Sequence, residues 1–156
     1  MTYITHSQAD TLAFRAALGE NLRPGDIVLL TGDLGAGKSV LARGIARAFG
    51  IEGPMPSPTF TLLIPYEGRE KFYHYDLYRL ADPDEFYAAG LDEYLGGDGI
   101  CVIEWPQMAE LEPEPAVCIE ITRGACEDER RLALTCAGFA RADELHTALE
   151  AWREDA

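Results

Sequence analysis

The segment from Gly32 to Ser39 reads Gly-Asp-Leu-Gly-Ala-Gly-Lys-Ser and matches the pattern G-x-x-x-x-G-K-[ST]. A short apolar stretch, Ile27 to Leu30, precedes it, and apolar residues at helical spacing follow from Val40 to Phe49. A strand, a glycine-rich loop and a helix in this order form the phosphate-binding loop of nucleoside triphosphate-binding proteins. This feature restricts the fold more than any other and indicates an α/β protein.

The residue types of the loop suit a phosphate chain. The glycines let the backbone bend around an anion and direct successive N–H groups at it, and the helix adds the positive end of its dipole. Lys38 is expected to reach the β- and γ-phosphates, and Ser39 to place its hydroxyl on Mg²⁺. The alternative is a glycine-rich turn before a capped helix. The residues expected to contact ATP or ADP here are Asp33, Leu34, Gly35, Ala36, Gly37, Lys38 and Ser39.

Length and composition predict a single domain over residues 1–156, because 47% of the residues are hydrophobic and the chain can bury a core. No apolar run reaches the length of a membrane span, and the first residues lack a secretion signal, so we expect a cytoplasmic protein without a membrane partner. The four cysteines form no C-x-x-C pair, which argues against a disulfide or a zinc site.

The charge is strongly acidic. The chain has 27 acidic and 13 basic residues, a net charge of −14. Proteins that bind nucleic acid by their own surface usually have a basic face. We therefore expect no DNA partner and no direct binding of RNA by this chain. We interpret the acidic clusters as solvated loops rather than as a docking face.

Apolar periodicity and turn residues predict the remaining elements. We expect a helix from a Ser7–Asp10 capping box to about Asn21, and a helix beginning at Asp82. The other expected elements are strands at 59–65, 71–77 and 100–104, a hairpin of 116–121 with 131–135, and a helix at 141–152. This order implies a small P-loop NTPase fold, in which helices flank a central, mainly parallel sheet with antiparallel edge strands.

Two acidic residues are candidates to complete the site. Glu104 follows a buried strand, where open α/β sheets place ligands, and is expected to hold Mg²⁺; the alternative is a carboxylate facing solvent. Asp76 shares one face of the strand at 71–77 with His74 and is the second candidate. Its alternative roles are pairing with Arg79 and capping the turn.

Other candidates have weaker support. Thr59 and Thr61 follow a proline-rich loop, where switch segments of P-loop proteins often place a hydroxyl near the γ-phosphate. We expect His74 to be a structural histidine rather than a base. Trp105 is expected either to stack near the nucleotide or to pack elsewhere. Arg130 opens a late strand and either reaches the nucleotide or forms a charged hairpin edge.

Four segments occur together: the phosphate-binding loop, Ser-Pro-Thr-Phe-Thr-Leu at 57–62, His-Tyr-Asp-Leu-Tyr-Arg-Leu at 74–80 and Ile-Glu-Trp-Pro at 103–106. In this combination the chain resembles the bacterial TsaE family, the ATPases of tRNA threonylcarbamoyladenosine (t6A) biosynthesis. The resemblance implies that the loop binds ATP or ADP and that Ser39 and Glu104 coordinate Mg²⁺. It also implies functional roles for Thr59 and Asp76, and a position near the nucleotide for Arg130.

The resemblance further implies the biological setting. Family members are weak ATPases alone and act with TsaD and TsaB, which hold the site that modifies adenosine 37 of ANN-decoding tRNAs. TsaC supplies the threonylcarbamoyl-adenylate. This chain is therefore expected to meet tRNA only indirectly, through the complex.

Three mechanisms fit the sequence. In the first, Lys38, Ser39 and Glu104 support ATP hydrolysis, and Asp76, Thr59 or a partner group orients the attacking water. In the second, the chain is a binding module that holds ATP and seldom hydrolyses it. In the third, it is a small-molecule kinase, which the absence of an insertion long enough for a lid makes the weakest of the three.

Overall fold

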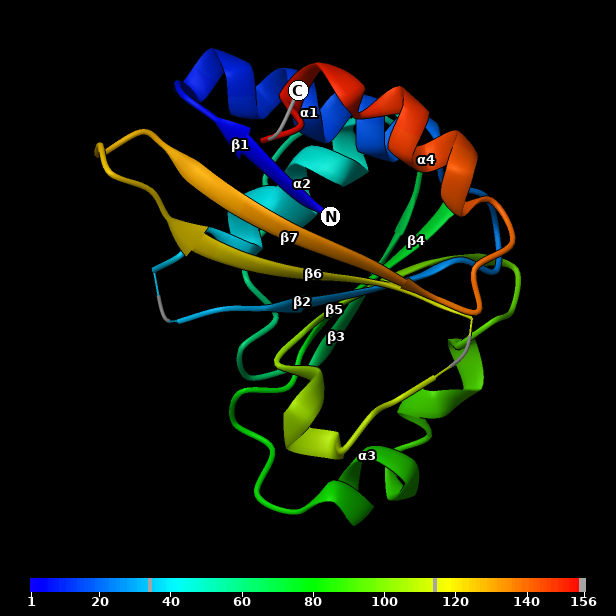
Figure 1. The fold of residues 1–156 in the computed structure, drawn as a ribbon. Helices are drawn as coiled ribbons and strands as arrows, with labels where there is room; N and C mark the ends of the chain where they lie inside the picture. The colour runs from blue at the N-terminus through cyan, green and yellow to red at the C-terminus, as the bar shows by residue number, and fades with distance from the viewer. Residues whose placement is uncertain (34, 114, 155–156) are drawn as a thin grey trace.

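The computed structural model describes residues 1–33, 35–113 and 115–154, and Figure 1 shows its ribbon. Within these residues, seven strands form one sheet in the order β1-β7-β6-β2-β5-β4-β3. The strands are β1 (Thr2–Thr5), β2 (Ile27–Thr31), β3 (Leu63–Glu67), β4 (Lys71–Asp76), β5 (Gly99–Glu104), β6 (Ala116–Arg123) and β7 (Arg130–Ala137). The α-helices are α1 (Gln8–Glu20), α2 (Lys38–Arg47), α3 (Pro83–Ala88) and α4 (Ala142–Ala148).

The centre of the sheet is parallel and its edges are antiparallel. Strands β6, β2, β5 and β4 run parallel as neighbours. Strand β3 pairs antiparallel with β4 at one edge, and β7 and β1 continue the sheet antiparallel at the other. This confirms the predicted fold class. Strand β1 was not predicted, because its four residues are too few to show a periodic pattern.

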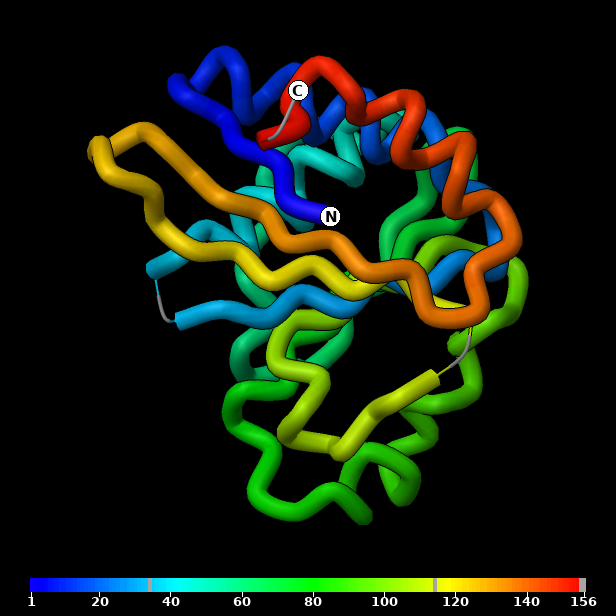
Figure 2. The backbone as a smooth tube through the Cα atoms, in the orientation of Figure 1, coloured from blue at the N-terminus to red at the C-terminus, as the bar shows by residue number. Residues whose placement is uncertain are grey.

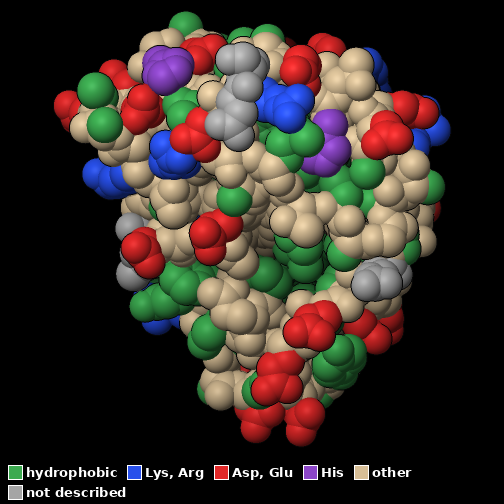
Figure 3. All heavy atoms as spheres, viewed as in Figure 1, with side chains coloured by type: hydrophobic (Ala, Val, Ile, Leu, Met, Phe, Trp, Pro, Cys, Tyr) green, Lys and Arg blue, Asp and Glu red, His purple; other side chains and the backbone are tan. Residues whose placement is uncertain are grey.

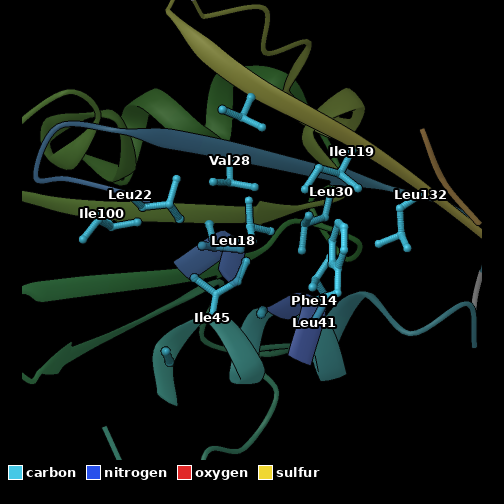
Figure 4. Close-up of a cluster of buried hydrophobic side chains, with 14 of the residues drawn as sticks. Phe14, Leu18, Leu22, Val28, Leu30, Leu41, Ile45, Ile100, Ile119 and Leu132 are labelled. Carbon is cyan, nitrogen blue, oxygen red and sulfur yellow. The ribbon is translucent and has the colours of Figure 1, made fainter. Parts of the chain in front are cut away.

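Helices lie on both faces of the sheet, with α1, α2 and α4 on one face and α3 on the other (Figure 1). The larger core packs α1 and α2 against the sheet, and Figure 4 shows its side chains interdigitating. Its labelled members are Phe14, Leu18, Leu22, Val28, Leu30, Leu41, Ile45, Ile100, Ile119 and Leu132. The smaller core, on the α3 side, includes Tyr75, Phe86 and Ile103.

Side chains along β4 alternate between the two faces of the sheet. Phe72 packs into the larger core, whereas Tyr73, Tyr75 and Leu77 pack into the smaller one. Because neighbouring parallel strands have the same alternation, the even-numbered residues of β5 also face α2. The last side chains of this face therefore point toward the phosphate-binding loop.

The first helix begins as predicted, but its capping box is incomplete. The Ser7 hydroxyl accepts the Asp10 N–H at 3.0 Å. The Asp10 carboxylate accepts the His6 N–H at 2.9 Å and the Trp152 indole N–H at 2.7 Å, rather than the Ser7 N–H. The short Asp side chain thus ties the helix start to the C-terminal segment.

The predicted C-terminal helix divides into two parts. Helix α4 ends at Ala148, and a 3₁₀ turn covers Glu150–Trp152. The chain then returns to β1, where the Glu154 N–H donates to the Thr2 carbonyl at 3.0 Å. The N-terminus and the last described residues therefore lie side by side (Figure 2).

The strand predicted from residue 59 was wrong at its start, because β3 begins at Leu63. Residues 59–62 form a turn in which the Leu62 N–H donates to the Pro58 carbonyl at 2.8 Å. Leu62 has a φ of 67°, a left-handed conformation that ends the extended backbone. Thr59 and Thr61 therefore lie in a loop, not in a strand.

The surface is largely polar, and acidic side chains gather near α3 at the lower end of the view in Figure 3. The first turn of α3 itself has Asp84 and Glu85. Among the helices of the described residues, none has the length and apolar character needed to cross a membrane.

Candidate functional site

The phosphate-binding loop joins the carboxyl end of β2 to the start of α2. Gly32 has a φ of 141°, and a Cβ atom there would lie 2.4 Å from the Ile121 carbonyl oxygen. Gly37 has a φ of 110° and caps α2, so the first N–H groups of the helix face the loop. Both positions require glycine, and together they form the bend that an anion site needs.

Lys38 is buried within this loop, with 4% of its surface exposed. Its ammonium donates to the carbonyls of Gly32 at 2.5 Å and Asp33 at 2.7 Å. It also lies 4.4 Å from the ring centroid of Trp105, whose φ of 58° turns the side chain toward the loop. Burial lowers the pKa of Lys38, and the carboxylates of Glu104, Asp33 and Asp76 partly offset this effect.

Glu104 is the last residue of β5 and is buried, with 3% of its surface exposed, rather than facing solvent. The Ser39 hydroxyl donates to its carboxylate, with Oγ 2.9 Å from Oε1 and 3.0 Å from Oε2. His74 Nε2 lies 2.6 Å from Oε2. The two residues predicted to hold Mg²⁺ are thus in direct contact.

Asp76 ends β4 beside Glu104 in the parallel pairing of β4 with β5. Its Oδ1 atom accepts the Tyr78 N–H at 3.1 Å, so Asp76 does cap the turn. Its Oδ2 atom accepts the Ser57 hydroxyl at 3.3 Å. Arg79 lies instead over the ring of Phe60, 4.5 Å from its centroid.

A cavity of about 440 Å³ brings most of the predicted residues together. Its lining includes Lys38, Ser39, Thr59, Asp76, Glu104 and Trp105. The Thr59 hydroxyl lies 3.1 Å from the Ser57 hydroxyl, which in turn contacts Asp76. Thr61 is not part of the lining.

Arg130 lies at a second cavity, of about 290 Å³, that shares Gly37 with the first. Its Nη1 atom donates to the carbonyls of Glu127 at 2.6 Å and Glu129 at 2.9 Å. Its Nε atom lies 3.9 Å from the place where a Cβ atom on Gly37 would be. Arg130 is therefore beside the loop, at a different cavity from the one that Glu104 lines.

The other described residues of the phosphate-binding loop form hydrogen bonds through their backbone. The Ala36 N–H donates to the Asp33 carbonyl at 3.1 Å, and Ala36 lines the second cavity. The Gly35 carbonyl accepts a hydrogen bond from Arg123 at 3.0 Å. The predicted contact at Leu34 lies outside the described residues.

Sequence reasoning missed two contributions to this site. Ser57 links Thr59 to Asp76, and His74 bonds to Glu104. Alternation along the strand puts His74 on the same face as Asp76, but its contact with Glu104 also depends on the pairing of β4 with β5, which the sequence does not show. The hydroxyl of Ser57 gave no such signal, because its loop has no regular period.

The donor atoms fit a magnesium ion that also binds phosphate. Ser39 and Glu104 offer hard oxygen ligands, and Mg²⁺ is usually held by one or two carboxylates together with phosphate oxygens. Across residues 1–33, 35–113 and 115–154, no group of three His, Cys, Asp or Glu side chains could hold a metal alone.

Comparison with known proteins gives consistent matches. Residues 5–132 match the family model described as threonylcarbamoyl adenosine biosynthesis protein TsaE. Two relatives are named tRNA threonylcarbamoyladenosine biosynthesis protein TsaE. The one from Treponema pallidum is 41% identical over 122 residues, which cover 78% of this chain and 90% of the relative. The one from Bacillus subtilis is 39% identical over 136 residues, which cover 86% and 84%.

A solved structure matches the whole architecture. The crystal structure of Bacillus subtilis YdiB superposes with a TM-score of 0.78 and 33% sequence identity, covering 97% of this chain and 94% of YdiB. The match therefore includes both antiparallel edges of the sheet as well as its parallel centre.

Proposed function

Because this chain belongs to the TsaE family of threonylcarbamoyl adenosine biosynthesis proteins, we propose that it is a Mg²⁺-dependent ATPase that acts in t6A modification of tRNA. The product is t6A at position 37 of ANN-decoding tRNAs. The observation that carries the proposal is the buried contact between Ser39 of the phosphate-binding loop and Glu104.

The distribution of buried polar groups supports a working site. The buried polar or charged side chains of the described residues are Thr5, Lys38, His74, Asp76 and Glu104. All of them except Thr5 lie at this site. Burying charged groups costs free energy, and clusters of this kind are typical of functional sites.

The chain's own groups account for binding the triphosphate. The N–H groups of the loop and the start of α2 would bind phosphate oxygens, and the Lys38 ammonium would exchange its two carbonyl partners for the β- and γ-phosphates. Bound Mg²⁺ would supply positive charge that offsets the negative charge of the phosphates. Ser39 and Glu104 would hold that ion, with the Ser39 proton still donated to Glu104.

Orientation of the attacking water falls to Asp76, Thr59 or a partner group. Asp76 and Thr59 are linked through Ser57, so both would respond to a change at the γ-phosphate. Arg47, in α2, donates hydrogen bonds to the carbonyls of Ile51 and Gly53, at the start of the loop that contains Ser57 and Thr59. Loss of the γ-phosphate would then relax residues 54–61 while the start of the loop stays anchored.

The second cavity suits the nucleoside part of ATP or ADP. It begins at Gly37, where the phosphates would end, and it combines the apolar side chains of Leu41 and Leu132 with the guanidinium of Arg130. A mixed apolar and polar lining of this kind is usual for nucleoside pockets. Arg130 would thus contact the nucleotide without touching the metal.

The partners we propose are TsaD and TsaB, in the cytoplasm. A net charge of −14 argues against a direct grip on tRNA, so the complex would supply the tRNA-binding surface. Hydrolysis would be weak in the isolated chain and stimulated by the partners.

Reconstituted t6A formation with Glu104→Ala separates an ATPase from a module that only holds ATP. We expect modification to be lost while ATP and partner binding remain. Glu120→Ala, which removes an exposed strand carboxylate, is the matched control and should behave as the unaltered protein. Full modification by Glu104→Ala would instead support the binding module.

A further inference from the structure

His74 is the one buried polar residue of the site to which the proposed function assigns no role. Its side chain is fully buried, and its Nε2 atom lies 2.6 Å from Oε2 of Glu104. The side chain of Glu104 is itself 3% exposed. The pair is therefore closed off from bulk water.

The direction of this hydrogen bond follows from the chemistry of the two groups. An ionised carboxylate has only acceptor atoms, so the proton of the bond lies on His74 Nε2 and the imidazole donates. Within the described part of the chain, His74 Nδ1 has no hydrogen-bond partner. The single strong contact of the ring is thus the one to Glu104.

The sheet holds the two residues in this relation. In the parallel pairing of β4 with β5, His74 lies opposite Val102 and Asp76 lies opposite Glu104. His74 and Glu104 are therefore diagonal neighbours on the face that packs against α2. The imidazole approaches the carboxylate from the sheet side, and Ser39 approaches it from the loop side.

We propose that His74 is a positioning residue that holds the Glu104 carboxylate toward Ser39 and the metal. The inference rests on the proposed function, since it requires Mg²⁺ at Ser39 and Glu104. The His74 N–H bonds to Oε2, and the carboxylate held in this way has both oxygens within reach of the Ser39 hydroxyl, at 2.9 Å from Oε1 and 3.0 Å from Oε2. Groups that orient a metal ligand in this way typically change metal affinity by about 10- to 100-fold when removed.

The test compares ADP affinity in chelator with ADP affinity across a range of free Mg²⁺, measured by calorimetry. The midpoint is the free Mg²⁺ concentration that gives half of the Mg²⁺-dependent gain in ADP affinity. His74→Leu removes the hydrogen-bond donor to Glu104, and we expect this midpoint to rise by about 10- to 100-fold. ADP affinity in chelator should stay near that of the unaltered protein, because the loop and Lys38 are unchanged. An unchanged midpoint in His74→Leu would overturn the inference.

Two further variants separate positioning from packing. His74→Gln keeps an N–H donor at a reach similar to Nε2 and should restore most of the Mg²⁺ response. Phe72→Leu alters a buried ring on the same face of β4, has no contact with Glu104 and should leave the midpoint unchanged. If His74→Leu does not fold, His74→Asn replaces it, since its shorter amide cannot reach Glu104. Equal midpoints for the Asn and Gln variants would then contradict the inference.

The same experiment distinguishes failure of the two proposals. If Mg²⁺ has no effect on ADP binding to the unaltered protein, the metal site itself is wrong. If Mg²⁺ strengthens binding equally in the unaltered protein and in His74→Leu, the metal site stands and the role of His74 is wrong.

Discussion

At the scale of single residues, the ends of two neighbouring parallel strands determine what the site contains. Strand β4 ends at Asp76 and β5 ends at Glu104, and the two lie side by side facing the phosphate-binding loop. The side chains that precede them on the same face are apolar or, at His74, bonded to Glu104. A buried scaffold thus presents two carboxylates to one cavity.

Lys38→Ala should lower nucleotide affinity or turnover by orders of magnitude while the fold is retained. The ammonium donates to two backbone carbonyls of its own loop and lies over the Trp105 ring, so its loss removes charge from the proposed phosphate site but no side-chain hydrogen bond between elements. Affinity for ATP and circular dichroism would be measured on the same sample. Lys71→Ala, at an exposed ion pair with Asp98, is the control. ATP turnover at the normal rate in Lys38→Ala would show that the phosphate-binding loop has no part in the mechanism.

The sequence predicted Glu104 and Asp76 because each follows an apolar or alternating run, which locates a strand end. It did not predict the contact of His74 with Glu104, since a lone histidine on a strand does not reveal its partner. That contact depends on which strands are neighbours and in what register, and both depend on long-range pairing. The family resemblance implied a position near the nucleotide for Arg130, but the residue pattern alone could not locate it beside the loop, because nearly a hundred residues separate it from Gly37.

At the scale of elements, backbone conformations with positive φ shape the loops around the cavity. Leu62 and Trp105 adopt left-handed conformations although neither is glycine. Trp105 packs on Lys38 and on Tyr78, and Leu62 accepts the Asp76 N–H at 3.0 Å. A left-handed conformation at a residue other than glycine persists only where surrounding contacts offset its strain. Residue propensities do not indicate where such contacts form. The early start predicted for β3 was wrong for this reason.

Gly32→Ala should destabilise the protein by about 2 kcal/mol or more, because the new Cβ atom would strike the Ile121 carbonyl in addition to the strain at positive φ. Gly50→Ala is the matched control. It also has a positive φ, of 78°, but no atom within 4 Å of the added Cβ, so about 1 kcal/mol is expected. Urea unfolding measures the free energy of unfolding of both variants. Equal destabilisation of the two would contradict the close approach of Gly32 to the Ile121 carbonyl.

The contact between β1 and α4 should weaken in acid. Burial and the N-terminal ammonium lower the pKa of His146 below its ordinary value of 6.5, and Asp143 only partly opposes them. The unfolded chain therefore takes up this proton more readily, so the free energy of unfolding falls as the pH drops through about 6.5. Protonation would also remove the acceptor of the Tyr3 hydroxyl, which lies 2.5 Å from His146 Nδ1.

Urea midpoints at pH 7.5 and pH 5.5 test this contribution. His146→Gln cannot titrate, so it should lose less stability between the two values than the unaltered protein. His6→Gln removes an exposed histidine and should not reduce the loss. Equal losses of stability between pH 7.5 and pH 5.5 in His146→Gln and in the unaltered protein would contradict this prediction.

At the scale of the whole molecule, the proposed nucleotide site lies at one end of the parallel strands of a strongly acidic protein. The fold class followed from the phosphate-binding loop and the order of elements. The meeting of the two chain ends did not, because it rests on β1 and on residues 153–154, whose pairing partners lie far away in the sequence.

The isolated chain should not bind tRNA in a salt-dependent manner. With 27 acidic and 13 basic residues it has no excess of cations to displace counterions from the phosphate backbone. Filter binding or anisotropy with labelled tRNA, at low and at physiological salt, would measure this. A micromolar complex that weakens as salt is added would contradict the charge argument.

We propose that this chain is an ATPase completed by its partners, with Glu104 as the metal carboxylate. The most direct measurement is phosphate release from ATP by the purified chain, alone and with TsaD and TsaB, using Glu104→Ala beside the unaltered protein. The account predicts slow release alone, strong stimulation by the partners and loss of stimulation in Glu104→Ala. Slow release that the partners leave unchanged, or stimulation that persists without the Glu104 carboxylate, would contradict it.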